Sequence, residues 1–129
     1  MPFFCNFICL TLPLTPETKG IIDLSKLEKM KRTAILVNGG RGELIVEKDL
    51  ITALDHGLIK AAGLDVYEKE PIGLENPIIN YTNVVTLPHA GSATHETRLQ
   101  MAKLAIQNLL NILENKPLEN VIDVERLFH

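Results

Sequence analysis

Two residues that could carry out chemistry each follow an apolar run of the sequence. Arg41 comes shortly after "TAILVN" (33–38), and His89 comes shortly after "NVVTL" (83–87). A guanidinium stays charged at any working pH, and its planar fork can hold both oxygens of a carboxylate. A neutral imidazole can give or take a proton near pH 7. These residue types suggest an anion-binding group and an acid–base group.

A carboxylate next to the imidazole would complete an acid–base pair. Glu68 and Glu70 both follow the run "KAAGLDV" (60–66). A carboxylate that hydrogen-bonds to the far ring nitrogen fixes the tautomer of the histidine. Periodicity does not choose between the two glutamates. A single arginine or histidine is more often structural. The position that these groups share after successive apolar runs is what indicates a site.

The elements that must position these groups alternate between strand and helix. Apolar, partly β-branched runs predict strands over 7–12, 33–38, 60–66 and 83–87. Apolar residues three and four positions apart predict helices over 23–31, 46–57 and about 94–115. Asp23 or Ser25 is available to cap the first helix, and Gly57 stands where the second should end. Short connections predict a parallel α/β sheet, in which ligands bind outside the carboxyl ends of the strands.

Two common ligand motifs are not completed. The stretch "GGRG" (39–42) meets Ile45 where a third glycine of G-x-G-x-x-G belongs. Its glycines are instead expected to let the backbone lie against a flat ligand. His95 and Glu96 begin an H-E-x-x-H pattern that Leu99 interrupts, so no metal site is predicted.

Composition and charge narrow the classes of partner. The formal net charge is −3, which gives no basic footprint for nucleic acid. No apolar run approaches the roughly 20 residues of a membrane span, so neither a nucleic acid nor a membrane is expected as partner. On one strand Cys5 and Cys9 would lie about 13 Å apart, too far for a disulfide. We expect buried, reduced thiols and, with no recognisable targeting signal, a cytoplasmic protein.

Four motifs in order resemble the D-isomer-specific 2-hydroxyacid dehydrogenases. They are "LPLTPETKG", "ILVNGGRGELI", "AAGLDVYEKEP" and "VVTLPHAGSATHETR", within about residues 7–118. The last is most similar to the glyoxylate/hydroxypyruvate reductase or 2-ketogluconate reductase branch. The resemblance implies the parallel-sheet second half of a Rossmann NAD(P)-binding domain over 1–92. A long helix and tail over 93–129 would then return to a substrate domain outside this sequence.

The resemblance also implies roles for single residues. Arg41 would bind the carboxylate of a 2-keto acid, His89 would be the acid–base group, and Glu70 would be the partner of His89. The implied cofactor-binding residues are Pro13, Gly39, Gly40, Arg41, Asp65, His89 and Gly91. Hydride would pass between the nicotinamide of the cofactor and C2 of a small 2-keto or 2-hydroxy acid. The cofactor would be NAD or NADP, and the resemblance to this branch favours NADP. The full-length protein would be a homodimer.

The sequence departs from the family pattern at several points. Gly39 and Gly40 replace small non-glycine residues before the arginine, which could loosen that loop. Val46 replaces the aspartate that commonly begins the next helix. The G-x-G-x-x-G fingerprint and the substrate domain are not found. We therefore expect a fragment that binds the dinucleotide weakly and is inactive by itself.

A function of a different class stays open at this stage. The same fold could serve as a non-catalytic protein-interaction module of the corepressor type. Exposed apolar surface on the last helix and the first strand would then be the functional feature. The joint presence of Arg41, Glu70 and His89 favours the enzyme.

Overall fold

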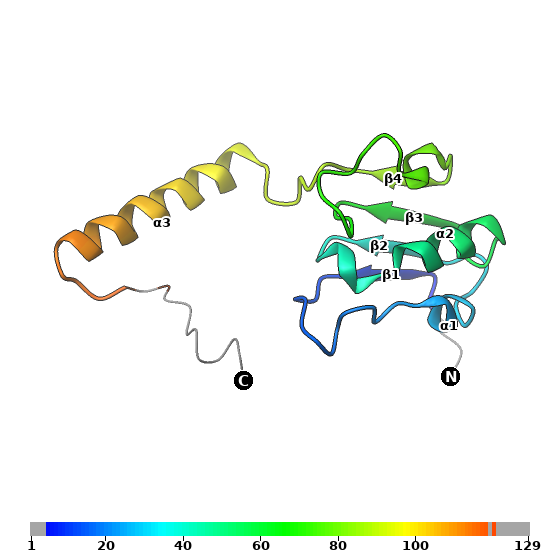
Figure 1. Cartoon of the computed structure of the whole chain (residues 1–129). Coiled ribbons are helices and arrows are strands. Elements are labelled where there is room, and N and C mark those ends of the chain that lie inside the picture. Colours follow the sequence, from blue (N-terminus) through cyan, green and yellow to red (C-terminus); the bar gives the residue numbers. More distant parts are fainter. Residues whose placement is uncertain (1–4, 119, 121–129) are drawn as a thin grey trace. The chain divides into compact units, whose positions relative to one another are not determined.

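Four short strands form one parallel sheet. The computed structural model describes residues 5–118 and 120. The strands are β1 (Phe7–Leu10), β2 (Ile35–Asn38), β3 (Ala61–Leu64) and β4 (Val84–Thr86), in the spatial order β1-β2-β3-β4. Each neighbouring pair is parallel, so all four carboxyl ends lie at one edge (Figure 1). The α/β fold expected from the alternation of elements is confirmed.

Helices and single turns connect the strands, and the three helices that the sequence pattern predicts are all shorter than expected. They are α1 (Leu24–Leu27), η1 (Gly42–Leu44), α2 (Glu47–Asp55) and η2 (Pro77–Asn80), with α3 (His95–Leu113) after the sheet. The predicted helix over 23–31 is reduced to α1 because the next backbone bonds, from Lys29 and Met30, are of the tighter three-residue type. The N-cap of α1 is Asp23, whose carboxylate accepts from the backbone N–H of Lys26.

The other elements differ from the predictions by a few residues at their ends. β1 stops at Leu10 because its ladder partner, Asn38, is the last residue of β2. Gly57 follows α2 with φ +60°, the left-handed conformation that suits glycine at the end of a helix. The predicted helix termination at this residue is confirmed.

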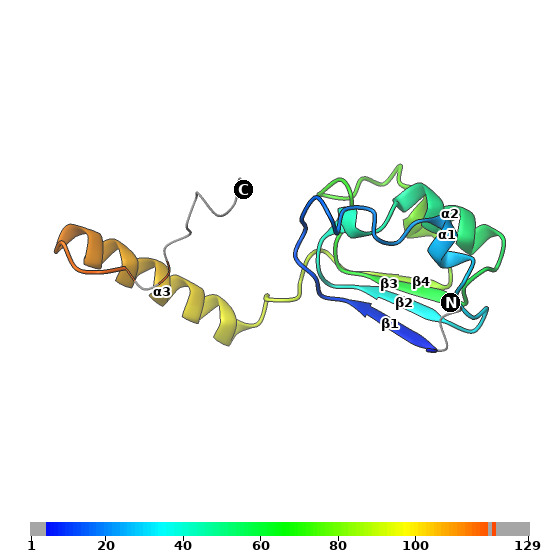
Figure 2. The same ribbon diagram turned by 90° about the horizontal axis from the view of Figure 1, so that it is seen from below.

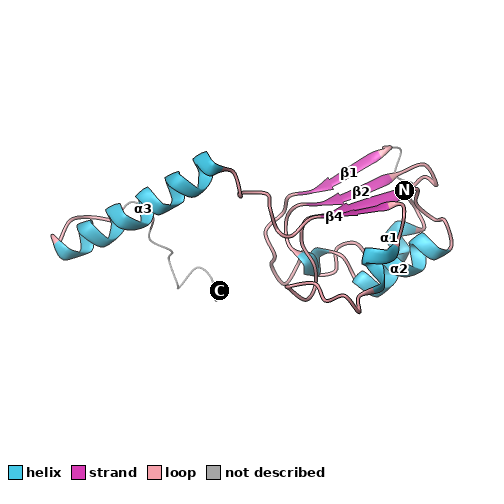
Figure 3. Cartoon of the chain, turned by 90° about the horizontal axis from the view of Figure 1, so that it is seen from above, coloured by secondary structure: helices cyan, strands magenta, loops and turns pink. Residues whose placement is uncertain are grey.

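The core lies on one face of the sheet. Figure 2 and Figure 3 show α1 and α2 on the same side of the strands. The side chains turned to that side are buried, among them Leu10, Leu36, Ala62 and Leu64. They pack with residues of the helices and loops, such as Leu27, Leu44, Leu50, Ile59 and Ile78. Apolar burial on this face therefore holds the strand ends in place.

No helix within residues 5–91 covers the opposite face of the sheet. Phe7 and Val85 on that face are 66% and 65% exposed. Cys9 shares the face with them, and it is exposed, as is Cys5. Both thiols are free, but the expectation that they are buried is wrong, because the alternation of the strand turns Cys9 away from the helices.

The chain divides into two compact units, Met1–Gly91 and Ser92–His129. In the second unit, α3 begins after Thr94, whose hydroxyl accepts from the backbone N–H of Thr97. Its side chains are exposed, including an apolar stripe through Leu99, Ile106, Leu109 and Leu113. Among the described residues, no helix has both the length and the apolar character that a bilayer span requires. The unpatterned tail over 116–129 lies mostly outside the described residues.

A pair of leucine substitutions tests this assignment of the core. Leu50 on α2 is 1% exposed, whereas Leu74 in the loop after β3 is 89% exposed. Leu50→Ala is expected to lower the free energy of unfolding by about 2–5 kcal/mol, because it leaves a cavity under the sheet. Leu74→Ala is expected to change it by less than about 0.5 kcal/mol. Urea unfolding measures both, and equal effects would contradict the assignment.

Candidate active site

The predicted site residues all belong to loops at the carboxyl edge of the sheet. Arg41 follows β2, Asp65 and Glu70 follow β3, and His89 follows β4. A groove of about 490 Å³ is lined by Thr11, Leu12, Pro13, Leu14, Gly39, Gly40 and Arg41. A second, of about 420 Å³, is lined by Tyr67, Glu70, Pro71, Ile72, Pro88 and His89. The sheet thus brings the predicted residues to one edge. Four of them line the first groove, and Glu70 and His89 line the second, whereas Asp65 and Gly91 line neither.

His89 and Glu70 form a hydrogen-bonded pair. The Nδ1 atom of His89 lies 2.8 Å from Oε2 of Glu70. The other carboxylate oxygen, Oε1, accepts from the backbone N–H of Tyr67 at 3.0 Å. The carboxylate is therefore oriented from both sides. When Nδ1 donates to Glu70, Nε2 is the ring nitrogen left to exchange a proton with a ligand.

The charge of Glu70 is stabilised by its neighbours. The hydrogen bond with His89 lowers the pKa of the Glu70 carboxyl, which partial desolvation opposes. The backbone N–H of Tyr67 and the positive charge of Arg41 lower the pKa of Glu70 further. The ionised carboxylate of Glu70 can accept a hydrogen bond from Nδ1 of His89, which fixes the tautomer and orientation of the imidazole.

The structure separates the two glutamates that the sequence pattern leaves equivalent. Glu68 points to the start of α2, where its Oε1 accepts from the backbone N–H of Glu47 at 2.9 Å. Glu70, two residues further on, meets His89. The path of the loop after β3 decides which glutamate reaches the imidazole, and hydrophobic periodicity carries no information on that path.

Asp65 fixes the turn that carries His89. His89 has φ 55°, a left-handed conformation that costs a non-glycine residue about 1–2 kcal/mol. The two carboxylate oxygens of Asp65 accept from the backbone N–H groups of Ala90 and Gly91, at 2.7 and 2.8 Å. Hydrogen bonds to a charged acceptor contribute about 1.5–3 kcal/mol and offset that cost. Asp65 therefore holds the backbone of the histidine turn.

Asn38 holds the arginine loop, and its role is not evident from the sequence. It is the last residue of β2 and only 1% exposed. Its side-chain amide donates to the carbonyl of Arg41 at 2.8 Å and its side-chain oxygen accepts from the backbone N–H of Gly40 at 3.1 Å. A polar residue that closes an apolar strand is the only sequence signal for this role. The guanidinium Nη1 of Arg41 donates to the carbonyl of Gly40 at 2.8 Å.

The glycines beside Arg41 approach the chain's own backbone. A Cβ added at Gly42 would lie 1.9 Å from the carbonyl carbon and oxygen of Tyr67. One added at Gly40 would lie 2.9 Å from the carbonyl oxygen of Leu12. For these two positions, the close approach expected toward a flat ligand is made to neighbouring loops instead. Of the three glycines around Arg41, Gly39 is the open one, with no atom within 4 Å of an added Cβ.

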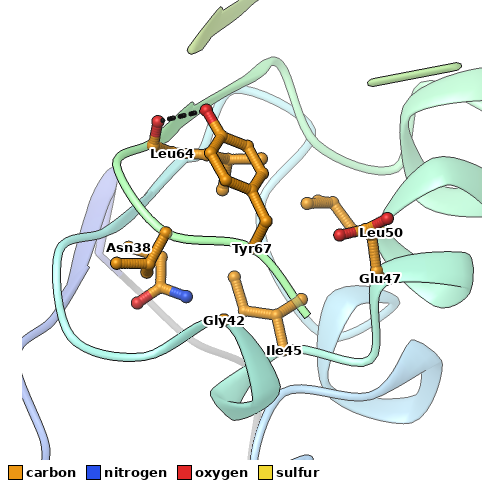
Figure 4. A pocket seen from close by; sticks show the side chains of 8 residues that line it. Asn38, Gly42, Ile45, Glu47, Leu50, Leu64 and Tyr67 are labelled. Carbon is orange, nitrogen blue, oxygen red and sulfur yellow. Dashed lines mark hydrogen bonds between the residues drawn. The ribbon is translucent and has the colours of Figure 1, made fainter. Parts of the chain in front are cut away.

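A small cavity lies beneath the loop that carries Glu70. It measures about 10 Å³, and Figure 4 shows Asn38, Gly42, Glu47, Leu50 and Tyr67 around it. The hydroxyl of Tyr67 donates toward the carbonyls of Leu64 and Leu87, at 3.1 and 2.8 Å, which ties the loops after β3 and β4 together. The space suffices for about one water molecule, so the loops are nearly close-packed against the core.

Comparison with known proteins identifies the family. Residues 4–91 match the model of the NAD binding domain of the D-isomer specific 2-hydroxyacid dehydrogenases. The chain belongs to this family. It is 50% identical over 118 residues to glyoxylate/hydroxypyruvate reductase B of Enterobacter sp. (strain 638), a match that covers 92% of this chain and 36% of the relative. The resemblance noted from the four motifs is confirmed.

Solved structures of the family have the same fold. The D-isomer specific 2-hydroxyacid dehydrogenase of Xanthobacter autotrophicus Py2 matches with a TM-score of 0.83 and 34% identity, over 92% of this chain and 39% of that chain. The NADPH-dependent glyoxylate/hydroxypyruvate reductase of Sinorhizobium meliloti, in complex with NADP and sulfate, matches with a TM-score of 0.75 and 32% identity, over 92% and 38%. The chain thus spans little more than a third of the length of these relatives.

Alanine at two neighbouring glycines tests the contact between the loops. Gly42→Ala is expected to lower the free energy of unfolding by about 1–3 kcal/mol or more, because its Cβ would meet the Tyr67 backbone. Gly39→Ala is the control; its site is open and its backbone is not left-handed. It is expected to stabilise the fold by about 0.4–1 kcal/mol. Urea unfolding of both variants measures these changes. An unchanged free energy of unfolding in Gly42→Ala would disprove the close approach.

The titration of Glu70 tests the acid–base pair. The carboxyl ¹³C resonance of Glu70 is expected to titrate below the ordinary glutamate value of about 4.3, and His89→Ala should return it toward that value. Because the pKa is lowered in the folded state, this pairing stabilises the fold above the unfolded pKa. That contribution is lost as the pH falls through the lowered value. An identical pKa in the two proteins would show that the pair does not form.

Proposed function

We propose that this chain supplies the substrate-binding and proton-transfer residues of an NAD(P)-dependent 2-hydroxyacid dehydrogenase that acts on glyoxylate or hydroxypyruvate. The observation that carries the proposal is the hydrogen bond between His89 and Glu70, at the sheet edge that also bears Arg41. The names of the Enterobacter and Sinorhizobium relatives support the substrate class. Because the chain spans about a third of those relatives, the complete activity belongs to the full-length protein.

His89 is proposed as the acid–base group. In the direction of reduction, the protonated imidazole gives its Nε2 proton to the oxygen of the substrate carbonyl, which becomes a hydroxyl. In the reverse direction Nε2 takes that proton back. Glu70 keeps Nδ1 protonated through its 2.8 Å hydrogen bond and stabilises the imidazolium before the transfer.

Arg41 is proposed to bind the substrate carboxylate. One of its N–H groups is used internally, on the carbonyl of Gly40. A guanidinium carries five N–H donors, so those remaining suffice for a carboxylate. The internal bond also limits the rotamers of the long side chain, which reduces the entropy lost when a ligand binds.

The groove between the loops after β1 and β2 fits a flat nicotinamide group. Pro13, Gly39, Gly40 and Arg41 line it, and the open position at Gly39 leaves its surface accessible. A bound nicotinamide supplies the hydride for C2 of the substrate. Asp65 and Gly91 contribute through the turn that holds His89. We propose NADP over NAD, following the Sinorhizobium relative described with NADP.

Two further parts of the proposal come from the sequence-based expectations and not from the geometry of the site. They are that the full-length protein is a homodimer and that it works in the cytoplasm. The alternative of a non-catalytic corepressor-type module receives no support from the relatives named above, which are dehydrogenases and reductases.

A chimeric enzyme tests the proposed roles. Residues 7–118 replace the matching segment of the Enterobacter reductase, and the reduction of hydroxypyruvate by NADPH is followed at 340 nm. His89→Ala in the active chimera is expected to lower kcat by about 10²–10⁴-fold, because general acid catalysis is lost. Arg41→Ala is expected to act mainly on KM.

The control for this experiment is His56→Ala. The ring of His56 contacts the carbonyl of Thr52 at the far end of α2, so this variant is expected to keep its activity. A His89→Ala chimera whose kcat stays within about threefold of the parent would disprove the assignment of the acid–base group.

A further inference from the structure

The first turn of α2 is capped from outside the helix. Val46 occupies the N-cap position and makes no side-chain hydrogen bond there. A helix start leaves backbone N–H groups without partners, and a carboxylate near them is favourable. Glu68 takes this place, with its Oε1 accepting from the backbone N–H of Glu47 at 2.9 Å. The missing aspartate at position 46 is thus compensated by the loop after β3.

The same loop is attached to α2 at two further points. The side-chain amide of Asn76 donates to the carboxylate of Glu47 at 2.7 Å. The hydroxyl of Tyr81 donates to Asp55, the last residue of α2, at 2.5 Å. The loop is therefore bonded to both ends of the helix, and Glu68 is the attachment closest in sequence to Glu70.

Glu68 is connected to the acid–base pair through a few bonds of one short segment. The preceding residue, Tyr67, donates its backbone N–H to Glu70, and Glu70 in turn meets His89. Figure 4 shows Gly42, Tyr67 and Glu47 around the same small cavity. A shift of the loop at Glu68 would therefore move the backbone that orients Glu70.

We propose that Glu68 is a positioning residue: by capping α2 from the loop after β3, it fixes the segment that carries Glu70 and so sets the hydrogen bond between Glu70 and His89. This inference rests on the roles proposed above for Glu70 and His89. Glu68 itself is exposed and directs its carboxylate to the helix, so it acts through its neighbours rather than on a ligand.

The experiment uses the 129-residue chain and two readouts. Glu68→Ala is expected to lower Tm by about 4–8 °C, as the loss of a helix cap does in a domain of this size. It is also expected to raise the pKa of Glu70, followed by carboxyl ¹³C NMR, by at least half of the rise that His89→Ala causes. Glu68→Gln keeps an acceptor oxygen and should restore both readouts in large part.

Two further variants separate a positioning role from a stabilising one. Val46→Asp combined with Glu68→Ala gives α2 a cap of its own, so Tm should recover while the pKa of Glu70 stays raised. Glu75→Ala removes another exposed carboxylate of the same loop, one that makes no hydrogen bond within the described residues. It should leave both readouts unchanged.

Three outcomes would overturn the proposal. They are an unchanged Glu70 pKa in Glu68→Ala, a pKa that recovers together with Tm in the double variant, and an equal pKa shift in Glu75→Ala. The pKa of Glu70 reports the geometry of the pair and Tm reports the stability of the fold, and neither readout measures turnover. A failure here would therefore leave the proposed reaction standing, and an inactive chimera would leave this inference standing.

Discussion

The arrangement of the candidate site depends on how closely two loop backbones approach each other. The loop after β2 meets the loop after β3 at Gly42, where an added Cβ would lie 1.9 Å from the Tyr67 backbone. No side chain fits between them, so the segment with Arg41 and the segment with Glu70 have a fixed relation. Since a closely packed interior allows little relaxation, this contact constrains the groups on both sides of it.

Hydrogen bonds from residues at the ends of the strands also hold the arginine loop and the histidine turn. Asn38 holds the arginine loop, and Asp65 holds the histidine turn by two backbone N–H groups. Both residues stand at or directly after the end of a strand. The hydrogen-bonded strands thus position exposed, charged side chains. Pairing alone would stabilise their arrangement little, because an exposed ion pair contributes about 0–1 kcal/mol.

The buried core and the candidate site lie in different parts of the same unit. The helix-covered face of the sheet contains the buried core, whereas the other face leaves Phe7 and Val85 largely exposed. Parallel sheets are ordinarily covered on both faces. Within residues 5–91 the buried apolar packing lies on one face, and polar bonds such as those of Asn38 and Glu68 hold the loops at the strand ends.

The sequence by itself determined the alternation of strands and helices, the parallel sheet and the edge at which Arg41, Glu70 and His89 gather. These follow from hydrophobic spacing and from the rule that successive parallel strands end at one edge. Periodicity left Glu68 and Glu70 equivalent, and the family resemblance implied Glu70, which the structure shows hydrogen-bonded to His89. Only the tertiary structure decided that Cys9 is exposed and that Gly42 approaches Tyr67. The physical reason is that these outcomes depend on the path of loops and on which sheet face the helices cover. Hydrophobic periodicity along the sequence contains no information on either of these features.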